Sequence, residues 1–75
     1  MRDPRLVAFG QRVRAIRKQK GLSQEGLAAL ADIDRSYMGH IERGEKNITL
    51  TKIYQIADAL EVTAEHLLDN QLSAS

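Results

Sequence analysis

The stretch DRSYMGHIERG, residues 34–44, predicts a short helix with one apolar side and one polar side. Successive helical residues turn by about 100°, so Met38 and Ile41 share a face that can pack on a core. The other face carries Arg35, Ser36, Gly39, His40 and Arg43. A glycine inside a helix costs about 0.8 to 1 kcal/mol relative to alanine. Gly39 therefore either serves a purpose on this free face or is a tolerated defect.

The residues before this stretch predict a first helix. Asp3 can cap it, and Pro4 lies at the first helical position, where its missing N–H costs nothing. Apolar residues then recur at steps of three and four, at Leu6, Phe9, Val13 and Ile16. That spacing predicts one buried stripe, and Gly21, after a cationic last turn, predicts the end of the helix.

A second helix is predicted over Gln24–Ala31, with Ser23 as its cap. Its apolar residues share one face, at Leu27, Ala28 and Ala31. Only a few residues then lead to Asp34, a good cap for the next helix, and Ile33 among them can fill the core. The resulting order is helix, tight turn, helix.

Two further helices complete the expected all-α fold. Gly44 ends the helix of residues 34–44, and Thr49 can cap a fourth helix. The fourth helix repeats the core spacing at Leu50, Ile53, Ile56, Ala57 and Leu60. A short fifth helix, capped by Thr63, is marked by Val62, Leu67 and Leu68.

The length of 75 residues predicts a single domain, with a core over about residues 4–69 and a frayed tail over residues 70–75. The chain has no cysteine, which fits a reducing cytoplasm and excludes a disulfide framework or a thiolate metal site. Its longest apolar run, Leu27–Ala31, is far shorter than the ~20 residues that span a bilayer. We expect a cytoplasmic protein with no signal peptide, no membrane partner and no cofactor.

Catalysis and metal binding are not expected either. Ser36 and His40 lie one turn apart, but an exposed helix offers no oxyanion hole and excludes no water. His66 lies on a separate predicted helix, so the two histidines do not outline a metal site. We expect His66 at the surface or in an interface.

The charges are segregated along the chain, although the net charge is only +1. Residues 1–20 carry seven basic side chains against the single acid Asp3, whereas residues 53–75 carry four acids and no lysine or arginine. This asymmetry can focus a positive potential that favours a polyanionic partner. Two oppositely charged, solvated helix faces would give the same pattern.

Three consecutive stretches, GLSQEGLAALA, DRSYMGHIERG and KNITLTKIYQIADAL, together resemble the lambda-repressor-like helix-turn-helix family, also called the XRE family. The resemblance covers about residues 9–68, and within the family the chain looks most like the controller proteins of restriction-modification systems. It implies five compact helices, of which the second and third form the helix-turn-helix. The third helix is then expected to lie in the major groove of double-stranded DNA.

The resemblance also implies roles for the free face of residues 34–44. Arg35 can pair with guanine, Ser36 can donate or accept a hydrogen bond, and His40 can reach a neighbouring base edge. Gly39 stands where family members place a polar side chain, so we expect close approach of the backbone there and one base contact fewer. For His40, a merely solvated histidine is the alternative.

Phosphate contacts are expected on either side of these base contacts. The family pattern places Gln24 on a phosphate at the start of the second helix. Arg43, Lys46 and Asn47 form a second group just past the third helix. The Tyr37 hydroxyl can also reach a phosphate, or its ring can cover the edge of the core.

Two further sets of residues are expected to be structural. Arg17 and Glu42 fall where family members often place an ion pair that holds the third helix. A homodimer is expected to use the fifth helix and the end of the fourth, through Tyr54, Val62, Leu67, Leu68 and Leu72. Such dimers match inverted half-sites about one helical turn (~34 Å) apart.

We therefore expect a homodimeric transcriptional regulator that represses or activates and can contact RNA polymerase. The alternative is a protein-interaction module, such as an antitoxin-like partner or adaptor with the same fold. An exposed Leu30 and the acidic C-terminal segment favour this alternative, whereas the cationic free face of residues 34–44 argues against it.

Overall fold

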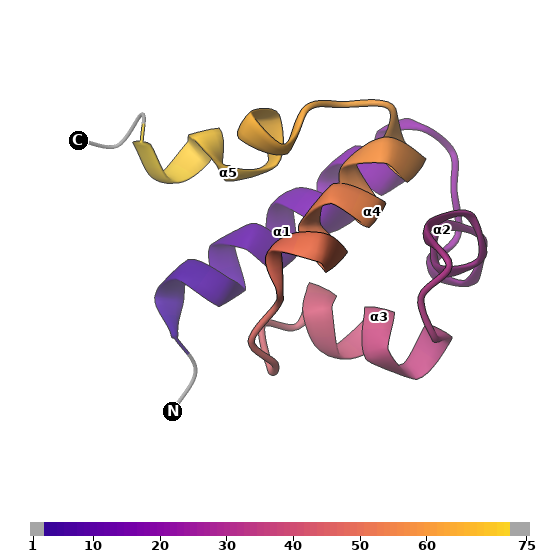
Figure 1. Ribbon diagram of the computed structural model, residues 1–75, viewed down its shortest axis with the longest axis horizontal. Helices are drawn as coiled ribbons and strands as arrows, with labels where there is room; N and C mark the ends of the chain where they lie inside the picture. The colour runs from indigo at the N-terminus through magenta and orange to yellow at the C-terminus, as the bar shows by residue number, and fades with distance from the viewer. Residues whose placement is uncertain (1–2, 73–75) are drawn as a thin grey trace.

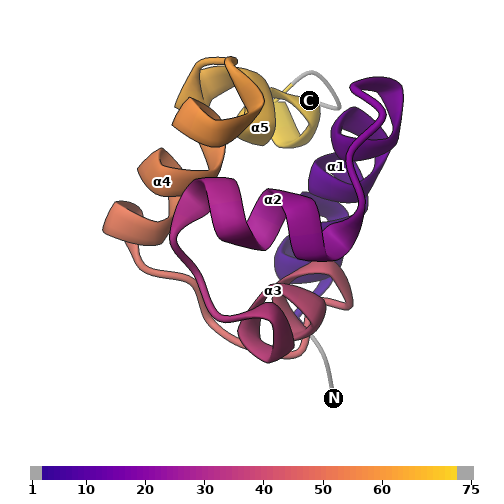
Figure 2. The same cartoon turned by 90° about the vertical axis from the view of Figure 1, so that its right-hand side faces the viewer.

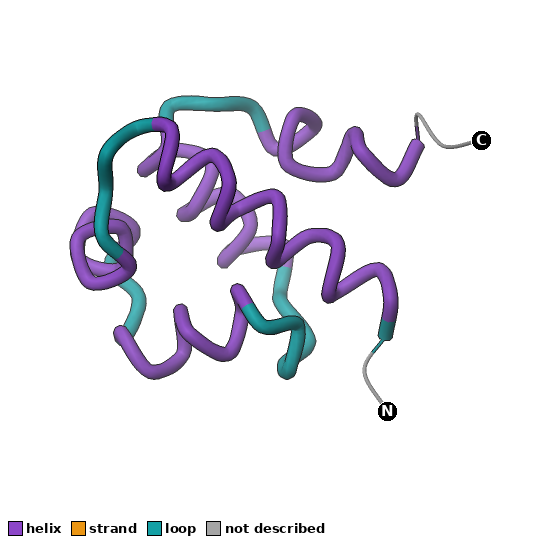
Figure 3. The backbone as a smooth tube through the Cα atoms, turned by 180° about the vertical axis from the view of Figure 1, so that it is seen from behind, coloured by secondary structure: helices purple, strands orange, loops and turns teal. Residues whose placement is uncertain are grey.

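The computed structural model describes the backbone of residues 3–72 and the side chains of residues 3–68. Its five helices are α1 (Pro4–Gln19), α2 (Gln24–Ala31), α3 (Arg35–Glu42), α4 (Leu50–Leu60) and α5 (Ala64–Leu72) (Figure 1). No strand occurs over the described range (Figure 3), so the prediction of an all-α, five-helix fold is confirmed. α5 extends to Leu72, and residues 73–75 lie outside the described range, so the frayed tail expected over residues 70–75 stays a prediction.

The predicted caps begin all five helices. Each cap's side-chain oxygen accepts a backbone N–H two or three residues ahead, at Asp3, Ser23, Asp34, Thr49 and Thr63. Each bond satisfies a donor that the helix itself leaves unpaired. The Arg5 guanidinium also donates to the Asp3 carboxylate, which lowers the pKa of Asp3 below its ordinary value.

The first four helices end in the same way. Near the end of each helix one residue has a positive φ: Gly21 and Gly44 directly follow the C-cap, whereas Asp32 and Glu61 are themselves the C-cap. In each case the next residue's N–H bonds a carbonyl five residues back, such as Glu45 N–H to His40 O at 2.9 Å. These are Schellman ends, for which glycine is the usual residue. The sequence predicted the two glycine ends but not those at Asp32 and Glu61.

The helices enclose one core, in which α3 packs against α1 and α2, α2 packs against α4, and α5 packs against α1 (Figures 1 and 2). Leu27, Met38 and Ile56 are fully buried at its centre. Leu50 was expected in this core but is 62% exposed. It lies in the first turn of α4, on the same shoulder of the helix as Tyr54, beside rather than within the buried stripe.

Two glycines bring α1 and the end of α3 into backbone contact. A Cβ atom at Gly10 would collide with the carbonyl oxygens of Ile41 and Glu42. At Gly44 a Cβ atom would lie 2.7 Å from Val7 Cα, and the φ of +72° also favours glycine. This close packing fixes the orientation of α3 on the domain. Gly10 had no predicted role.

Candidate nucleic-acid interface

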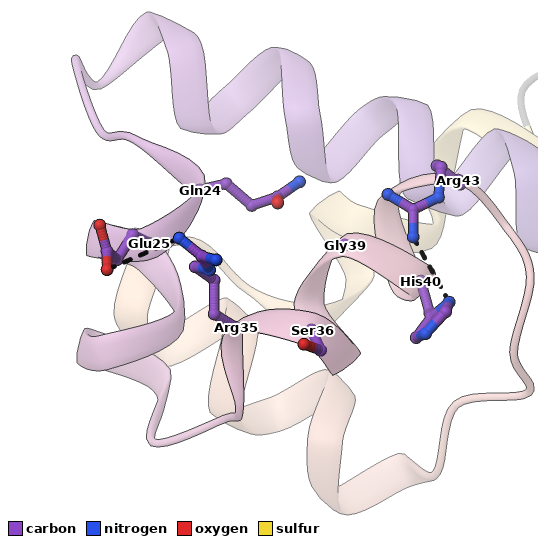
Figure 4. A pocket seen from close by; sticks show the side chains of 7 residues that line it. All are labelled: Gln24, Glu25, Arg35, Ser36, Gly39, His40 and Arg43. Atoms are coloured by element: carbon purple, nitrogen blue, oxygen red, sulfur yellow. Dashed lines mark hydrogen bonds and ion pairs between the residues drawn. The ribbon is translucent and has the colours of Figure 1, made fainter.

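A shallow hollow lies between the start of α2 and the outer face of α3, by which we mean Arg35, Ser36, Gly39, His40 and Arg43 (Figure 4). Gln24 and Glu25 of α2 complete its lining. The hollow thus gathers all four predicted base-reading residues and two of the five predicted phosphate-binding residues. Three further predicted phosphate-binding residues, Tyr37, Lys46 and Asn47, are not part of its lining.

Arg35 extends into solvent from the first turn of α3, with 67% of its side chain exposed. Its Nη1 lies 3.8 Å from Glu25 Oε2, a long contact between exposed groups that contributes little because water screens it. Ser36 is exposed beside it. Both side chains can therefore change partner at little cost.

Close approach to the helix backbone was expected at Gly39, but two side chains cover this residue. A Cβ atom there would lie 3.1 Å from Arg43 Nη1 and 3.4 Å from Gln24 Oε1, and the residue is buried. The covering atoms are the ends of long, flexible side chains. A molecule can reach the Gly39 backbone only after they move aside.

At the far end of α3 the carboxylate of Glu45 contacts both His40 and Arg43. Glu45 Oε1 lies 2.7 Å from His40 Nδ1 and 3.1 Å from Arg43 Nε. Arg43 Nη2 lies 3.4 Å from the same His40 nitrogen. Sequence reasoning missed Glu45, because the left-handed turn at Gly44 is what brings it back toward α3.

Gln24 connects the hollow to a buried ion pair. Arg17 Nε donates to Glu42 Oε2 at 2.7 Å and Arg17 Nη2 donates to Oε1 at 3.0 Å, with 10% and 4% of the two side chains exposed. Gln24 Nε2 donates to the same Oε1 at 3.1 Å, and Arg17 Nη1 donates to Leu22 O. The expected pair is present and ties α1, the α1–α2 turn, α2 and α3 together.

Tyr37 lies on the flank of α3, where its ring packs against the edge of the core. Its hydroxyl donates to the carbonyl of Asn47 at 3.1 Å, which holds the α3–α4 connection beside α3. Lys46 and Asn47 are exposed in this connection, and Lys52 Nζ lies 5.9 Å from the Tyr37 ring centroid. The ring thus covers the edge of the core, which is one of the two interpretations expected. A contact between the hydroxyl and a phosphate stays a prediction.

The residues expected in a dimer interface differ in exposure and in the hollows that they line. Tyr54, 53% exposed, and half-buried Val62 line the same hollow, but Leu68 lines a different groove with residues of α1. Leu67 is only 1% exposed, so its assignment to the interface is wrong: it packs in the core of its own domain. The side chain of Leu72 lies outside the described residues.

Within the described range, no three histidine, aspartate or glutamate side chains cluster in a way that could hold a metal ion. None of the helices of residues 3–72 is long and apolar enough to cross a membrane.

The sequence pattern of the helix-turn-helix family matches residues 13–67, and this chain belongs to that family. It is thus a DNA-binding transcriptional regulator of the XRE type and not an enzyme.

Its relatives include controller proteins of restriction-modification systems. The control protein C.BamHI of Bacillus amyloliquefaciens is 48% identical over 64 residues, which cover 84% of this chain and 79% of the relative. The crystal structure of the restriction-modification controller protein C.AhdI from Aeromonas hydrophila is 52% identical, with a TM-score of 0.81, and the match covers 83% of this chain and 94% of that chain. A structure of SinR, the master regulator for biofilm formation, in complex with DNA is 35% identical over 81% of this chain and 98% of that chain, with a TM-score of 0.78.

Proposed function

We propose that this chain is a restriction-modification controller that binds inverted-repeat operators as a homodimer, with α2 and α3 as its helix-turn-helix. The outer face of α3 carries the proposal. It is an exposed surface of arginine, serine and histidine on a short helix that is rigidly packed on its other side. Such a helix fits a major groove about 12 Å wide and offers donors to base edges.

The exposure of each side chain supports a division of labour on the DNA. In this division Arg35 and Ser36, in the first turn of α3, read bases together with His40, which lies one turn further on. Gln24 and Arg43 line the same hollow, and Lys46 and Asn47 are exposed in the connection after α3; these four residues contact phosphates. Phosphate contacts fix the register of the helix, whereas base contacts select the sequence.

The homodimer is proposed to use the exposed shoulder of α4 and the α4–α5 turn. Tyr54 and Val62 line one hollow there, and Leu50, 62% exposed, adds an apolar side chain one turn before Tyr54. Burial of such side chains is the main driving force of association. Leu68 contributes if the interface extends along α5, and contact with RNA polymerase at a promoter belongs to the same proposal.

The regulatory context is supported by the two controller proteins about half identical to this chain, C.BamHI and C.AhdI. Both are matched over most of their length as well as over most of this chain. We therefore assign the chain to the control of a restriction-modification gene set.

A second candidate, an adaptor that binds a protein through this fold, is favoured by one observation. Leu30 is 61% exposed at the end of α2 and shares a groove with Leu22 and Ala59. Lys20, Asp58 and Glu61 also line this groove, so it offers both apolar and charged contacts to a side chain of another protein.

Selection from a random duplex library with the full-length protein tests the proposal. Enrichment of an inverted repeat with half-sites about one helical turn apart is the expected result. Retention of DNA without enrichment of any sequence would mean that only phosphate contacts operate, and would favour the adaptor.

A further inference from the structure

A carboxylate that does not help to attract DNA lies beside the outer face of α3. Glu45 lies beside His40 and Arg43, and its negative charge repels phosphate while it neutralises part of the positive charge of Arg43. Only 28% of its side chain is exposed, compared with 38% for His40 and 52% for Arg43. Its position therefore calls for a role other than affinity.

The contact between Glu45 and His40 determines which ring nitrogen of neutral His40 carries the proton. An ionised carboxylate can only accept hydrogen bonds, so at 2.7 Å the Nδ1 atom of His40 must donate. Arg43 Nη2, 3.4 Å from the same nitrogen, cannot then donate to it, because Nδ1 has no free lone pair. In the neutral ring the proton on Nδ1 leaves Nε2 as an acceptor, whereas a doubly protonated ring would donate from both nitrogens. The hydrogen bonds of His40 to other described residues all involve Nδ1 rather than Nε2.

We propose that Glu45 is a specificity-determining positioning residue, which holds His40 in the tautomer whose Nε2 accepts a hydrogen bond from a base. The inference rests on the proposed function, since it requires α3 in the major groove. There the donors are the amino groups of cytosine and adenine, whereas guanine presents two acceptors and thymine an acceptor and a methyl group. The pair of Glu45 and His40 thus selects cytosine or adenine at the base that His40 faces.

Replacement of Glu45 by glutamine removes this selection. The glutamine amide can donate to Nδ1 as well as accept from it, so both tautomers of His40 become available. Nε2 can then donate to guanine or accept from cytosine and adenine. The same change removes a negative charge from the surface, so binding to DNA of any sequence becomes tighter.

The test selects operators from a random duplex library with the wild type, Glu45→Gln, His40→Ala and Glu25→Gln. Glu25 lines the same hollow but pairs with Arg35 rather than His40, so Glu25→Gln is a charge-matched control. His40→Ala identifies the base pair concerned. At that pair we expect a preference of about fivefold for cytosine or adenine in the wild type and in Glu25→Gln, and none in Glu45→Gln.

Two results overturn the inference. In one, Glu45→Gln keeps the wild-type preference at that base pair while the wild type enriches an operator. In the other, Glu25→Gln loses the preference equally, which would trace the effect to charge. A wild type that enriches no sequence at all would instead remove the proposed function itself, so the two failures are distinguishable.

Discussion

The two sides of α3 differ in how they are held. On the inner side Met38 is fully buried, Ile41 is 2% exposed, and the helix backbone touches α1 at Gly10. On the outer side Arg35 and Arg43 extend into water, where Arg35 pairs with Glu25 and Arg43 pairs with Glu45. The inner side thus determines where the helix lies, and the outer side determines what it can contact. Changes on the inner side should lower the free energy of unfolding, whereas removal of an exposed side chain on the outer side should mainly alter DNA binding.

The largest expected effect is on the buried pair behind α3. Glu42→Ala leaves the Arg17 guanidinium buried without a carboxylate and should lower the free energy of unfolding by about 3 to 5 kcal/mol. Urea denaturation followed by circular dichroism measures it. The double variant Arg17→Met/Glu42→Leu should recover most of this loss, because neither charge then remains buried. A loss below about 1 kcal/mol for Glu42→Ala would mean that the pair is solvated as surface pairs are.

Two glycine substitutions sharpen the comparison of the two sides. Gly10→Ala should destabilise the domain by about 1 to 3 kcal/mol, because its Cβ meets backbone carbonyls that cannot move alone. Gly39→Ala meets only the ends of Arg43 and Gln24, and should gain up to about 1 kcal/mol from helix propensity. Equal thermal shifts for the two variants would show that the outer side is as closely packed as the inner side.

Arg35→Ala should leave the stability unchanged and cost about 1 to 3 kcal/mol of binding to the selected operator, with relaxed preference at one base pair. Titrations of the operator and of random DNA by fluorescence anisotropy measure both effects. Equal losses on operator and random DNA would remove Arg35 from base reading.

Arg43→Ala should weaken binding to all sequences by a similar factor. We expect the slope of log affinity against log salt concentration to become shallower by about one unit, because one phosphate contact is lost. The measurement is a salt series on operator and random DNA. An unchanged slope would mean that Arg43 serves only to hold Glu45 and to cover Gly39.

Most of the fold was predictable because its signals are local. The caps at Asp3, Ser23, Asp34, Thr49 and Thr63 precede their helices in the sequence, and each apolar stripe repeats with the helical period. Leu50 and Leu67 were assigned wrongly because periodicity does not tell the edge of a stripe from its centre, or a core from an interface.

The features that were missed depend on tertiary contacts. Gly10 matters only because α3 crosses α1 at that point, and Glu45 meets His40 only because the chain reverses at Gly44. The helix ends at Asp32 and Glu61 lack the glycine that would have predicted their left-handed conformation. The sequence predicted which residues form the outer face of α3. It did not predict that Arg43 and Gln24 cover Gly39.

The central claim, that the outer face of α3 reads bases in the major groove, is tested most directly by 7-deazaguanine. This base lacks the N7 acceptor that guanine presents in the major groove and keeps its Watson–Crick edge. Substitution at the guanine that Arg35→Ala identifies should weaken wild-type binding about fivefold and should not weaken Arg35→Ala further. Wild-type binding that ignores the substitution, or equal losses for the two proteins, would contradict the claim.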